Sequence, residues 1–599
     1  MERITKKLKK ALKRVAVSII LIISRNATVG FLPLRWLSKL PLLMLFWLLK
    51  DDSYAVISHA ANQKHVEAQK KPRRSQLPLR FFVTRVLIGD RATPANRYSE
   101  LLAQAQPQSE IKHQLVHRFM NAGRLDLAKA TVVDLMTGNL DEFPLERRLQ
   151  VYRSAGIICF MLGQNKEANQ YWRLAGEFRK TLFKPSTPTK YRILGSSWFA
   201  AVGHVAMLDY YLKYKHLYGQ EDHRIVATIN PNAPIYTSLG CASDLMRKFS
   251  ELGISIIVED ELAADYDNWA KANGAPKWQQ LSTLEREAMI DDFWEHEFPD
   301  GEILSYTHAA SRIQKEWEQN KRFPLLAITQ AEKTWLDAFL AKLGLPLNAW
   351  FVCLHVREAG FHKQWNSKLP AMRDSEIEDY YPAIQEIVNA GGWVLRMGDP
   401  SMKPIPRMRN VIDYAHSAHR VPLADILLAA SCRFFLGTNS GFATIPAIYG
   451  IPCALSNWVP IGWPLWPTQD LITCKLFREK STQRFLSLQE MFERGLAFLQ
   501  NWSDLPEDVE LVANTPEEIR QLTLEMLSCF GSMKRSLWEV GAPLEVQNEY
   551  ARIARSYETF TSSRFAGSFV NKYPEVFTFP EMAVSASKVD EDIFSYSSK

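Results

Sequence analysis

The residues best suited to chemistry centre on a loop bounded by glycines, Gly437-Thr438-Asn439-Ser440-Gly441. The loop follows an apolar run and precedes a short helical stretch, so it can turn sharply and aim free backbone N–H groups at an anion. It has neither the lysine of a nucleoside-triphosphate loop nor the dinucleotide pattern G-x-G-x-x-G. Arg357, which ends another predicted strand, is a fixed cation able to grip a diphosphate through two N–H groups. Together, the loop and Arg357 predict a diphosphate site.

Two predicted strands of the same region also end in polar or glycine residues. "WFVCLHVREAG" ends in His355, Arg357 and Glu358, and "WVLRMGDP" ends in Arg396, Gly398 and Asp399. Parallel strands place such ends on one edge of a sheet, where ligands bind.

Several of these residues have an equally simple structural interpretation. His355 can order the end of its strand, Glu358 can pair with Arg357, and Asp399 can cap a turn before Pro400. Asp374, in the polar loop "RDSEIEDY", can form a salt bridge or stand at a helix N-terminus instead of acting in catalysis.

The elements that must position these residues alternate between strand and helix. "YRILGSSWFAAVGHVAMLDYYLKYKHLYG" reads as a strand, a loop carrying Gly203 and His204, and a helix, and further strand and helix patterns follow. This alternation predicts an α/β fold with two doubly wound, Rossmann-like domains, at residues 186–345 and 346–545. We expect a helix crossing back at 546–579 and a disordered tail at 580–599.

A helical module is expected at residues 61–185. "AGRLDLAKATVVDLM" and "LGQNKEANQYWRLA" share a turn glycine, Gly123 or Gly163, and an alanine, Ala128 or Ala168, where two helices can meet closely. The pattern resembles tetratricopeptide (TPR) helix pairs. Such a module can dock a protein partner or brace the α/β part.

The first 60 residues form a basic and apolar segment. Residues 1–50 hold eleven Lys or Arg against one acid, a charge of +10, so the rest of the chain sums to −3 within a total of +7. A basic amphipathic helix followed by apolar stretches of about ten residues predicts attachment to an anionic membrane surface at the cytoplasmic face of an inner membrane, peripheral or monotopic. The alternatives are a cleaved signal peptide, a membrane-spanning segment, and an ordinary helix with a solvated basic face.

Charge and cysteine content exclude other classes. A nucleic-acid-binding protein would carry its positive charge on a folded face. Here the net positive charge is confined to residues 1–50. The seven cysteines are scattered without a C-x-x-C pair, so neither a disulfide framework nor a zinc site is expected.

At this point the motifs reveal a resemblance. "HVR", "RDSEIEDY", "WVLRMGDP", "FFLGTNSGFATIPAIYGIP" and "LSNWVP" occur in this order. They resemble a family of bacterial glycosyltransferases of GT-B type associated with surface-polysaccharide genes. The glycine loop is more distantly similar to the nucleotide-sugar loop of heptosyltransferases, and His355-Val356-Arg357 is similar to the H-x-R motif of fucosyltransferases.

The resemblance implies transfer of a sugar from a nucleoside-diphosphate sugar to a glycan or lipid-linked acceptor. It implies that Arg357 and the loop residues Gly437, Thr438, Asn439, Ser440 and Gly441 bind the donor diphosphate, with His355, Gly398 and Asp399 near the donor pocket. His204 stands where heptosyltransferases have the acceptor base. Glu358, Asp374 and Asp399 are the reserve bases.

No metal and no cofactor are expected. The metal-binding pattern D-x-D occurs at Asp265 and Asp590, in a polar helical stretch and in the tail, at a frequency near chance. A nucleotide-sugar epimerase of the same double α/β architecture is an alternative enzyme. A membrane-tethered scaffold with a TPR-like binding module is the non-enzymatic alternative.

Overall fold

A computed structural model gives the fold of the greater part of the chain. It describes residues 109–121, 124–138, 140, 143–182, 190–199, 201–229, 241–358, 372–463, 467, 469–500, 502–530, 540–560 and 562–579. The expected membrane segment and the tail at 580–599 lie outside these residues. None of the helices in the described ranges has the length and apolar composition needed to cross a membrane. The chain divides into two compact units, Met1–Gly138 and Asn139–Lys599.

In the described part of the smaller unit, two helices pack on each other: α6 (Ser109–Asn121) and α7 (Leu125–Gly138). Val116, Leu127, Ala128 and Val132 are almost completely buried. The small side chain of Ala128 permits a close approach, as its position in the motif predicted.

The larger unit begins with a second helix pair, α8 (Leu145–Met161) and α9 (Asn165–Leu182). Gly156 of α8 lies against Trp172 of α9, and a Cβ at position 156 would come within 2.2 Å of the Trp172 Nε1. Gly163 turns the chain between the helices with a φ of +75°, a conformation that glycine adopts without strain. The expected helical region preceding the α/β part is therefore confirmed.

The first α/β domain is built on a four-stranded parallel sheet of order β3-β2-β1-β4. Its strands are β1 (Tyr191–Leu194), β2 (Arg224–Ile229), β3 (Ile254–Val258) and β4 (Ile290–Asp291). A short antiparallel pair, β5 (Glu295–Glu297) and β6 (Ile303–Ser305), follows. The helices are α10 (Val202–Ala206), α11 (Leu208–Leu217), α13 (Cys241–Glu251), α14 (Leu262–Asn273), α15 (Thr283–Ala288), α16 (Tyr306–Gln319) and the connecting α17 (Gln330–Lys342).

The second α/β domain has a seven-stranded parallel sheet of order β15-β12-β11-β10-β7-β8-β9. Its strands are β7 (Phe351–His355), β8 (Trp393–Arg396), β9 (Val411–Ile412), β10 (Phe435–Gly437), β11 (Cys453–Trp458), β12 (Leu471–Cys474) and β15 (Arg564–Phe565). The central strands β7, β10 and β11 are buried along their whole length, as expected of a parallel sheet covered on both faces. An antiparallel pair, β13 (Leu476–Glu479) and β14 (Val509–Val512), lies beside it.

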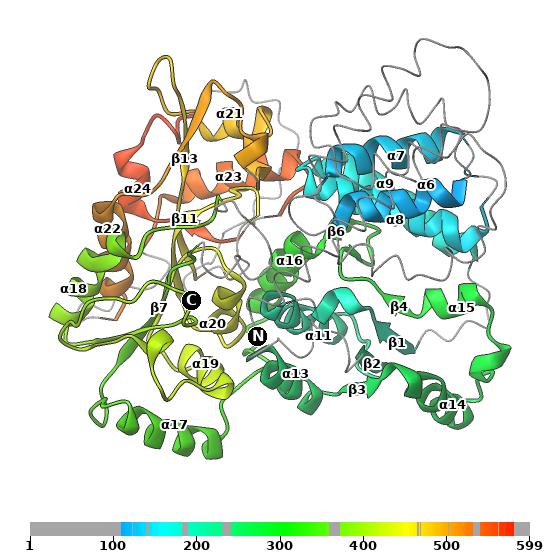
Figure 1. Ribbon diagram of the computed structural model, residues 1–599, viewed down its shortest axis with the longest axis horizontal. Coiled ribbons are helices and arrows are strands. Elements are labelled where there is room, and N and C mark those ends of the chain that lie inside the picture. Colours follow the sequence, from blue (N-terminus) through cyan, green and yellow to red (C-terminus); the bar gives the residue numbers. More distant parts are fainter. Residues whose placement is uncertain are drawn as a thin grey trace, which may run out of the picture. The chain divides into compact units, whose positions relative to one another are not determined.

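Helices lie on both sides of this sheet, with α18 (Tyr381–Asn389) and α22 (Pro516–Ser528) on one side and α19 (Pro422–Ala429) and α20 (Thr444–Ile448) on the other (Figure 1). Helix α22 begins with a capping box, in which Thr515 and Glu518 satisfy each other's backbone N–H groups. The expected α/β fold with parallel sheets is confirmed.

The C-terminal segment is more varied than the single helix expected. After α21 (Leu488–Glu493) and α22, α23 (Leu544–Ser556) is followed by β15, which joins the edge of the second sheet, and by α24 (Gly567–Lys572). Arg555 of α23 forms an ion pair with Glu302 of the first α/β domain at 2.7 Å. The segment therefore contacts both domains.

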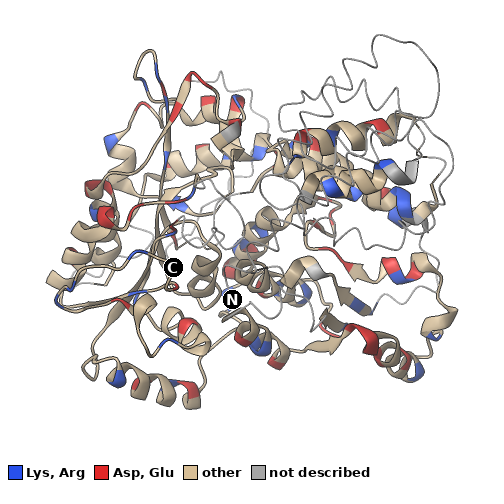
Figure 2. Ribbon diagram, in the orientation of Figure 1, with Lys and Arg blue, Asp and Glu red and all other residues tan. Residues whose placement is uncertain are grey.

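Acidic and basic residues are interspersed over the helices of the described part (Figure 2).

Candidate functional site

The candidate site lies where the order of strands in the second sheet reverses. Chain order runs from β7 outward through β8 and β9 on one side, and from β10 outward through β11 and β12 on the other. Strands β7 and β10 are direct neighbours, with Gly437 paired to His355. In doubly wound sheets the loops diverge at this point and leave a crevice beyond the carboxyl ends of the strands. The sequence had placed Arg357 and the glycine loop at the ends of these two strands.

Two hydrogen bonds join the ends of β7 and β10. The backbone N–H of Thr438 donates to the His355 carbonyl at 3.1 Å, and the Thr438 hydroxyl accepts from the Arg357 N–H at 2.9 Å. A side chain at position 437 would come within 2.3 Å of the His355 carbonyl oxygen, so glycine is required there. Thr438 is completely buried, and its hydroxyl orients Arg357 from within the fold.

The rest of the loop leaves backbone donors unused. Ser440 caps the following 3-10 helix, Gly441–Ala443, by accepting from the Ala443 N–H, and Asn439 donates its side-chain amide to the Val459 carbonyl at 2.9 Å. The backbone N–H groups of residues 439–442 have no acceptor among the described residues. The loop therefore presents four donors and no side-chain carboxylate, a suitable environment for an anion.

Two partly buried arginines, Arg357 and Arg373, lie at this end of the second sheet. The Arg357 Nε donates to Asp374 at 3.1 Å. Burial and, to a smaller extent, the neighbouring positive charge of Arg357 lower the pKa of Arg373 to about 10, while Tyr306 and Asp374 oppose the shift. Arg373 forms no ion pair with any described residue. A partly buried guanidinium that has no ion-pair partner in the described part of the chain, near a second guanidinium, favours binding of a ligand that carries more than one negative charge.

Lys475 fixes the segment that carries Arg373. It follows β12, is buried, and its Nζ donates to the carbonyl oxygens of Met372 and Asp374, each at 2.8 Å. These two carbonyls flank Arg373 in the chain, so the lysine holds the backbone on both sides of that residue. Burial lowers the pKa of Lys475 to about 8, while Asp374 and Asp379 oppose the shift.

His204 lies on α10, after the first strand of the first domain. Its Nδ1 is 2.7 Å from the Ser197 carbonyl, and because a carbonyl only accepts, Nδ1 carries the proton. The Nε2 then holds a lone pair, and no described residue donates to it. Burial lowers the pKa of His204, so the ring is neutral at physiological pH. This tautomer can accept a proton at Nε2.

A column of rings links His204 to the arginines. Its imidazole stacks on Phe293 with centroids 4.1 Å apart, and Phe293 packs on Tyr306 at 4.2 Å. Burial raises the pKa of Tyr306 to about 12, and the nearby positive charge of Arg373 opposes the shift. Tyr306 of the first domain and Arg373 of the second are therefore near enough to interact electrostatically.

The two α/β domains also meet through backbone. A Cβ at Gly203 would lie 2.9 Å from the Gly441 Cα, and one at Gly441 would lie 3.1 Å from the Gly203 nitrogen. Consequently the loop next to His204 and the loop with free N–H groups lie in direct contact.

The other predicted residues have structural partners. His355 stacks on Phe442, and its Nδ1 is 3.2 Å from the Ser440 hydroxyl; burial, with Arg396 and Arg357, lowers its pKa to about 4. Glu358 pairs with Arg396 at 2.6 Å, so the alternative expectation of a Glu358–Arg357 pair is wrong.

Gly398 and Asp399 form the turn after β8. Gly398 has a φ of +139°, and a Cβ there would meet the Met402 sulfur at 2.1 Å. Asp399 accepts from the Ser401 N–H at 2.8 Å, which agrees with its expected capping role. Asp265 of the first D-x-D pattern lies on α14 and binds Arg224 and the Tyr191 hydroxyl. Asp590 lies outside the described residues.

Three residues at the site were not predicted as site residues: Tyr306, Arg373 and Lys475. Lys475 follows the buried strand "LITC", and the strand-end rule that selected Arg357 would have found it. Arg373 stands next to the predicted Asp374. For Tyr306 the sequence carried no signal, because it is brought to the site by packing between the domains.

The fold and this site define an α/β protein in which two parallel-sheet domains meet beside a loop with backbone N–H groups and two arginines. No protein-family model matches the sequence, and a search of curated proteins finds no significant match. Among solved structures, the chain is similar to a glycosyl transferase family 9 protein from Veillonella parvula, with 11% identity and a TM-score of 0.31, over 57% of this chain and 98% of that one.

It is also similar to the dodecameric iron-containing glycosyltransferase TibC from enterotoxigenic E. coli, with 13% identity and a TM-score of 0.24, over 45% of this chain and 58% of that one. A TibC structure described as a heptosyltransferase in complex with ADP-D-β-D-heptose matches with 12% identity and a TM-score of 0.24, over 46% and 59%. The distant similarity to heptosyltransferases expected from the sequence is confirmed. At these TM-scores the superposition carries no argument about individual residues.

Proposed function

We propose that the chain is a glycosyltransferase of GT-B type that moves a sugar from a nucleoside-diphosphate sugar to a hydroxyl of a glycan or lipid-linked acceptor. The observation that carries the proposal is Arg357, which is bonded through its backbone to Thr438 of the loop and interacts with the nearby charge of Arg373, together with the loop N–H groups of residues 439–442, which have no acceptor among the described residues. Fixed donors of this kind stabilise negative charge as it develops, which is the main requirement when a diphosphate leaves.

In the proposed step, the bond between the anomeric carbon of the sugar and the diphosphate oxygen breaks, and its electron pair stays on the diphosphate. Arg357 and Arg373 stabilise that charge, together with the loop N–H groups. The acceptor oxygen forms the new bond to the anomeric carbon and gives its proton to the Nε2 of His204. The Ser197 carbonyl supports the resulting imidazolium through Nδ1–H.

The reserve bases have weaker support than His204. Glu358 is held by Arg396 and by the Lys403 N–H, and Asp374 by Arg357. Each of these carboxylates stabilises a neighbouring cation or loop, and moving a proton onto it would weaken that contact. Metal independence also belongs to the proposal, since the two arginines supply the positive charge that a divalent cation would otherwise supply.

The cellular setting is proposed from sequence. Residues 1–50, with their charge of +10, would hold the enzyme on the anionic cytoplasmic face of an inner membrane, where a lipid-linked acceptor of surface-polysaccharide synthesis is found. A protein partner for the TPR-like helices remains part of the same proposal.

The experiment is a thermal-shift and calorimetric screen of the full chain against nucleoside diphosphates and their sugars. We expect at least one nucleotide to stabilise the protein, and Arg357→Ala or Arg373→Ala to weaken its binding by about tenfold to a hundredfold, the usual value of a charge-assisted hydrogen bond.

Arg433→Ala is the matched control, because Arg433 precedes β10 at the opposite end of the same strand and lies over Trp350. It should leave nucleotide binding unchanged. Failure of every nucleotide to bind would reject the transferase. Binding followed by interconversion of the sugar without transfer would favour the epimerase.

A further inference from the structure

The helix pair α8–α9 inserts one aromatic side chain between the two α/β domains. Phe160 of α8 is 1% exposed, and its ring stacks on Trp463 of the second domain with centroids 4.5 Å apart and planes inclined by 4°. Three rings of the first domain surround the same side chain: Trp294 at 6.3 Å, Tyr306 at 6.1 Å and His308 at 6.4 Å. Phe160 therefore contacts both α/β domains at once.

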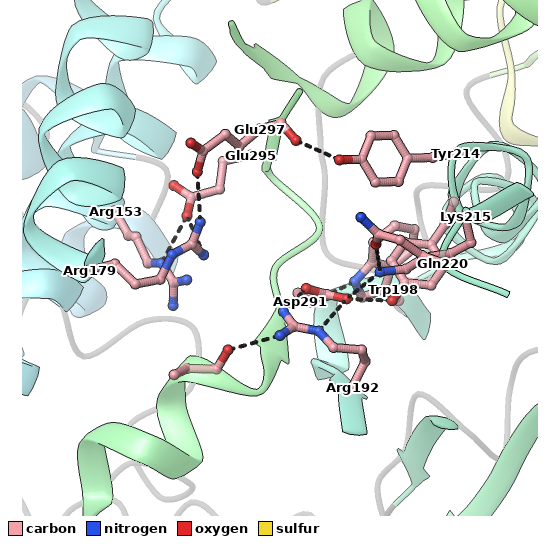
Figure 3. Close-up of polar contacts among 12 residues, drawn as sticks. Arg153, Arg179, Arg192, Trp198, Tyr214, Lys215, Gln220, Asp291, Glu295 and Glu297 are labelled. Carbon is pink, nitrogen blue, oxygen red and sulfur yellow. Dashed lines mark hydrogen bonds and ion pairs between the residues drawn. The ribbon is translucent and has the colours of Figure 1, made fainter. Parts of the chain in front are cut away.

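Ion pairs attach the helix pair to the first domain. Arg153 of α8 donates to Glu295 of β5 at 3.1 Å, and Arg179 of α9 donates to Glu297 at 3.4 Å (Figure 3). The Arg153 and Glu295 side chains are only 9% and 8% exposed. These ion pairs fix the orientation of the helix pair on the first domain.

A second set of contacts attaches the helix pair to the end of α23 and to the second domain. Asn169 and Arg173 of α9 both donate to the Glu558 carboxylate, at 2.9 Å and 2.8 Å. At the turn between α8 and α9, Gly163 lies so close to Phe498 that a Cβ would come within 2.7 Å of the Phe498 Cβ. The helix pair thus spans the two domains.

The rings around Phe160 continue into the candidate site. Tyr306 packs on Phe293, which stacks on His204, and Tyr306 lies near Arg373. His308 donates from Nε2 to the Gly462 carbonyl at 3.1 Å, which adds a direct contact between the domains. A displacement of Phe160 would therefore move Tyr306 relative to His204 and Arg373.

We propose that Phe160 is a positioning residue, which sets Tyr306 and Trp463 against each other and, with the rest of α8–α9, holds Gly203 against Gly441. The surface of α8–α9 that carries Phe160 serves this internal role. The expected effect of Phe160 on turnover rests on the proposed glycosyl transfer. Its effect on the contact between the two domains does not.

The first test compares Phe160→Ala and Phe160→Leu with the unaltered chain by hydrogen exchange, solution X-ray scattering and kinetics. In Phe160→Ala, amide exchange at residues 202–206 and 441–448 should accelerate by at least about tenfold, because the contact between the domains opens more often. Turnover should fall by about tenfold or more, while the dissociation constant of the nucleotide identified by the binding screen changes less than about threefold. Phe160→Leu should recover part of both effects.

Leu149→Ala is the control, since Leu149 is buried in the same helix and is not part of the ring cluster around Phe160. It should lower the stability of the helix pair and leave exchange at residues 202–206 near that of the unaltered chain. Equal exchange in both alanine variants, or unchanged exchange in Phe160→Ala, would overturn the proposal.

A surface variant keeps the test decisive if Phe160→Ala fails to fold. Arg173→Glu repels Glu558, and adding Glu558→Arg restores an attractive pair; the side chains are 44% and 33% exposed. The single variant should accelerate exchange at 202–206 and the double variant should reverse this. Arg484→Glu, from a pair with Glu490 of similar exposure within the second domain, should have no effect there.

These measurements distinguish the positioning role of Phe160 from the proposed glycosyl transfer. Hydrogen exchange and scattering need no substrate. Faster exchange in Phe160→Ala would therefore support the positioning role of Phe160 even if no nucleotide bound. If Phe160→Ala lost turnover while its amide exchange stayed normal, the loss would arise in the chemical step, and the positioning role of Phe160 would be rejected.

Discussion

Gly203 and Gly441 touch through their backbones, although they belong to different α/β domains. A Cβ at position 203 would lie 2.9 Å from the Gly441 Cα, closer than real side chains approach backbone. This contact brings the neighbour of His204 against the loop that carries free N–H groups. The proposed base and the proposed diphosphate site therefore share one crevice only while these glycines remain in contact.

We expect Gly203→Ala to force the domains apart by a fraction of an ångström. Turnover should fall by about tenfold to a hundredfold, since small displacements of reacting groups are costly, whereas nucleotide binding to the second domain should change little. Gly195→Ala is the control, because its Cβ would meet Ile290 at 3.8 Å, an ordinary contact. Steady-state kinetics and calorimetry on both variants give the comparison, and equal turnover would contradict the expectation.

His204→Ala should lower the rate of transfer by about a hundredfold to ten-thousandfold, the usual contribution of a general base. Because burial lowers the pKa of His204, the activity of the unaltered enzyme should fall on the acidic side with a midpoint below pH 6.5, as Nε2 becomes protonated. The pH dependence of kcat/KM tests this. The half-buried His216 of α11, replaced by alanine, should leave the profile intact; an acidic limb that survives in His204→Ala would point to another base.

Lys475→Met should weaken nucleotide binding by roughly tenfold, because the carbonyls of Met372 and Asp374 lose their donor and Arg373 loses its fixed position. The pKa of Lys475 is lowered to about 8, so its charge disappears as pH rises through 8. Binding to the unaltered chain should therefore weaken between pH 7 and pH 9, and binding to Lys475→Met should not follow this trend. Calorimetry at pH 7 and pH 9 measures this difference. Lys480 is exposed, and Lys480→Met is the control.

Asp425 should make stability depend on pH. Burial raises its pKa to about 7, against the influence of Arg420 and Tyr414. The folded state therefore keeps a proton that the unfolded state releases above about pH 4, and stability falls as pH rises from 4 to 7. Asp425→Asn should reduce the loss of unfolding free energy between pH 5 and pH 8 by roughly 2–3 kcal/mol.

Denaturant unfolding at the two pH values measures this difference. Asp337→Asn, an exposed position on α17, should unfold with the same pH dependence as the unaltered chain. An unchanged dependence in Asp425→Asn would show that Asp425 does not hold the proton.

The fold was predictable to the extent that it follows from local patterns. The buried run Phe351–His355 and the alternation of such runs with helices identify a parallel α/β protein, because only a strand covered on both faces is apolar throughout. The same reasoning placed Arg357 and Gly437 at strand ends. It also suggested the structural role of Asp399, since a carboxylate before Pro400 readily caps a turn.

Charge partners were less predictable. Glu358 is adjacent to Arg357 in the chain, yet it pairs with Arg396 of the neighbouring strand, and Arg357 pairs with Asp374. The choice depends on β8 lying beside β7, which no local pattern encodes. Residues brought together by packing, such as Tyr306 and Phe160, gave no signal of their role for the same reason.

The sequence by itself determined where strands end and which of those ends carry glycine or positive charge, because strand and turn preferences act over a few neighbouring residues. Only the tertiary structure decided that β7 and β10 are neighbours, that Gly203 meets Gly441, and that Arg373 is near enough to Arg357 for their charges to interact. These contacts join residues far apart in the chain. Burial and packing of the whole α/β unit fix them.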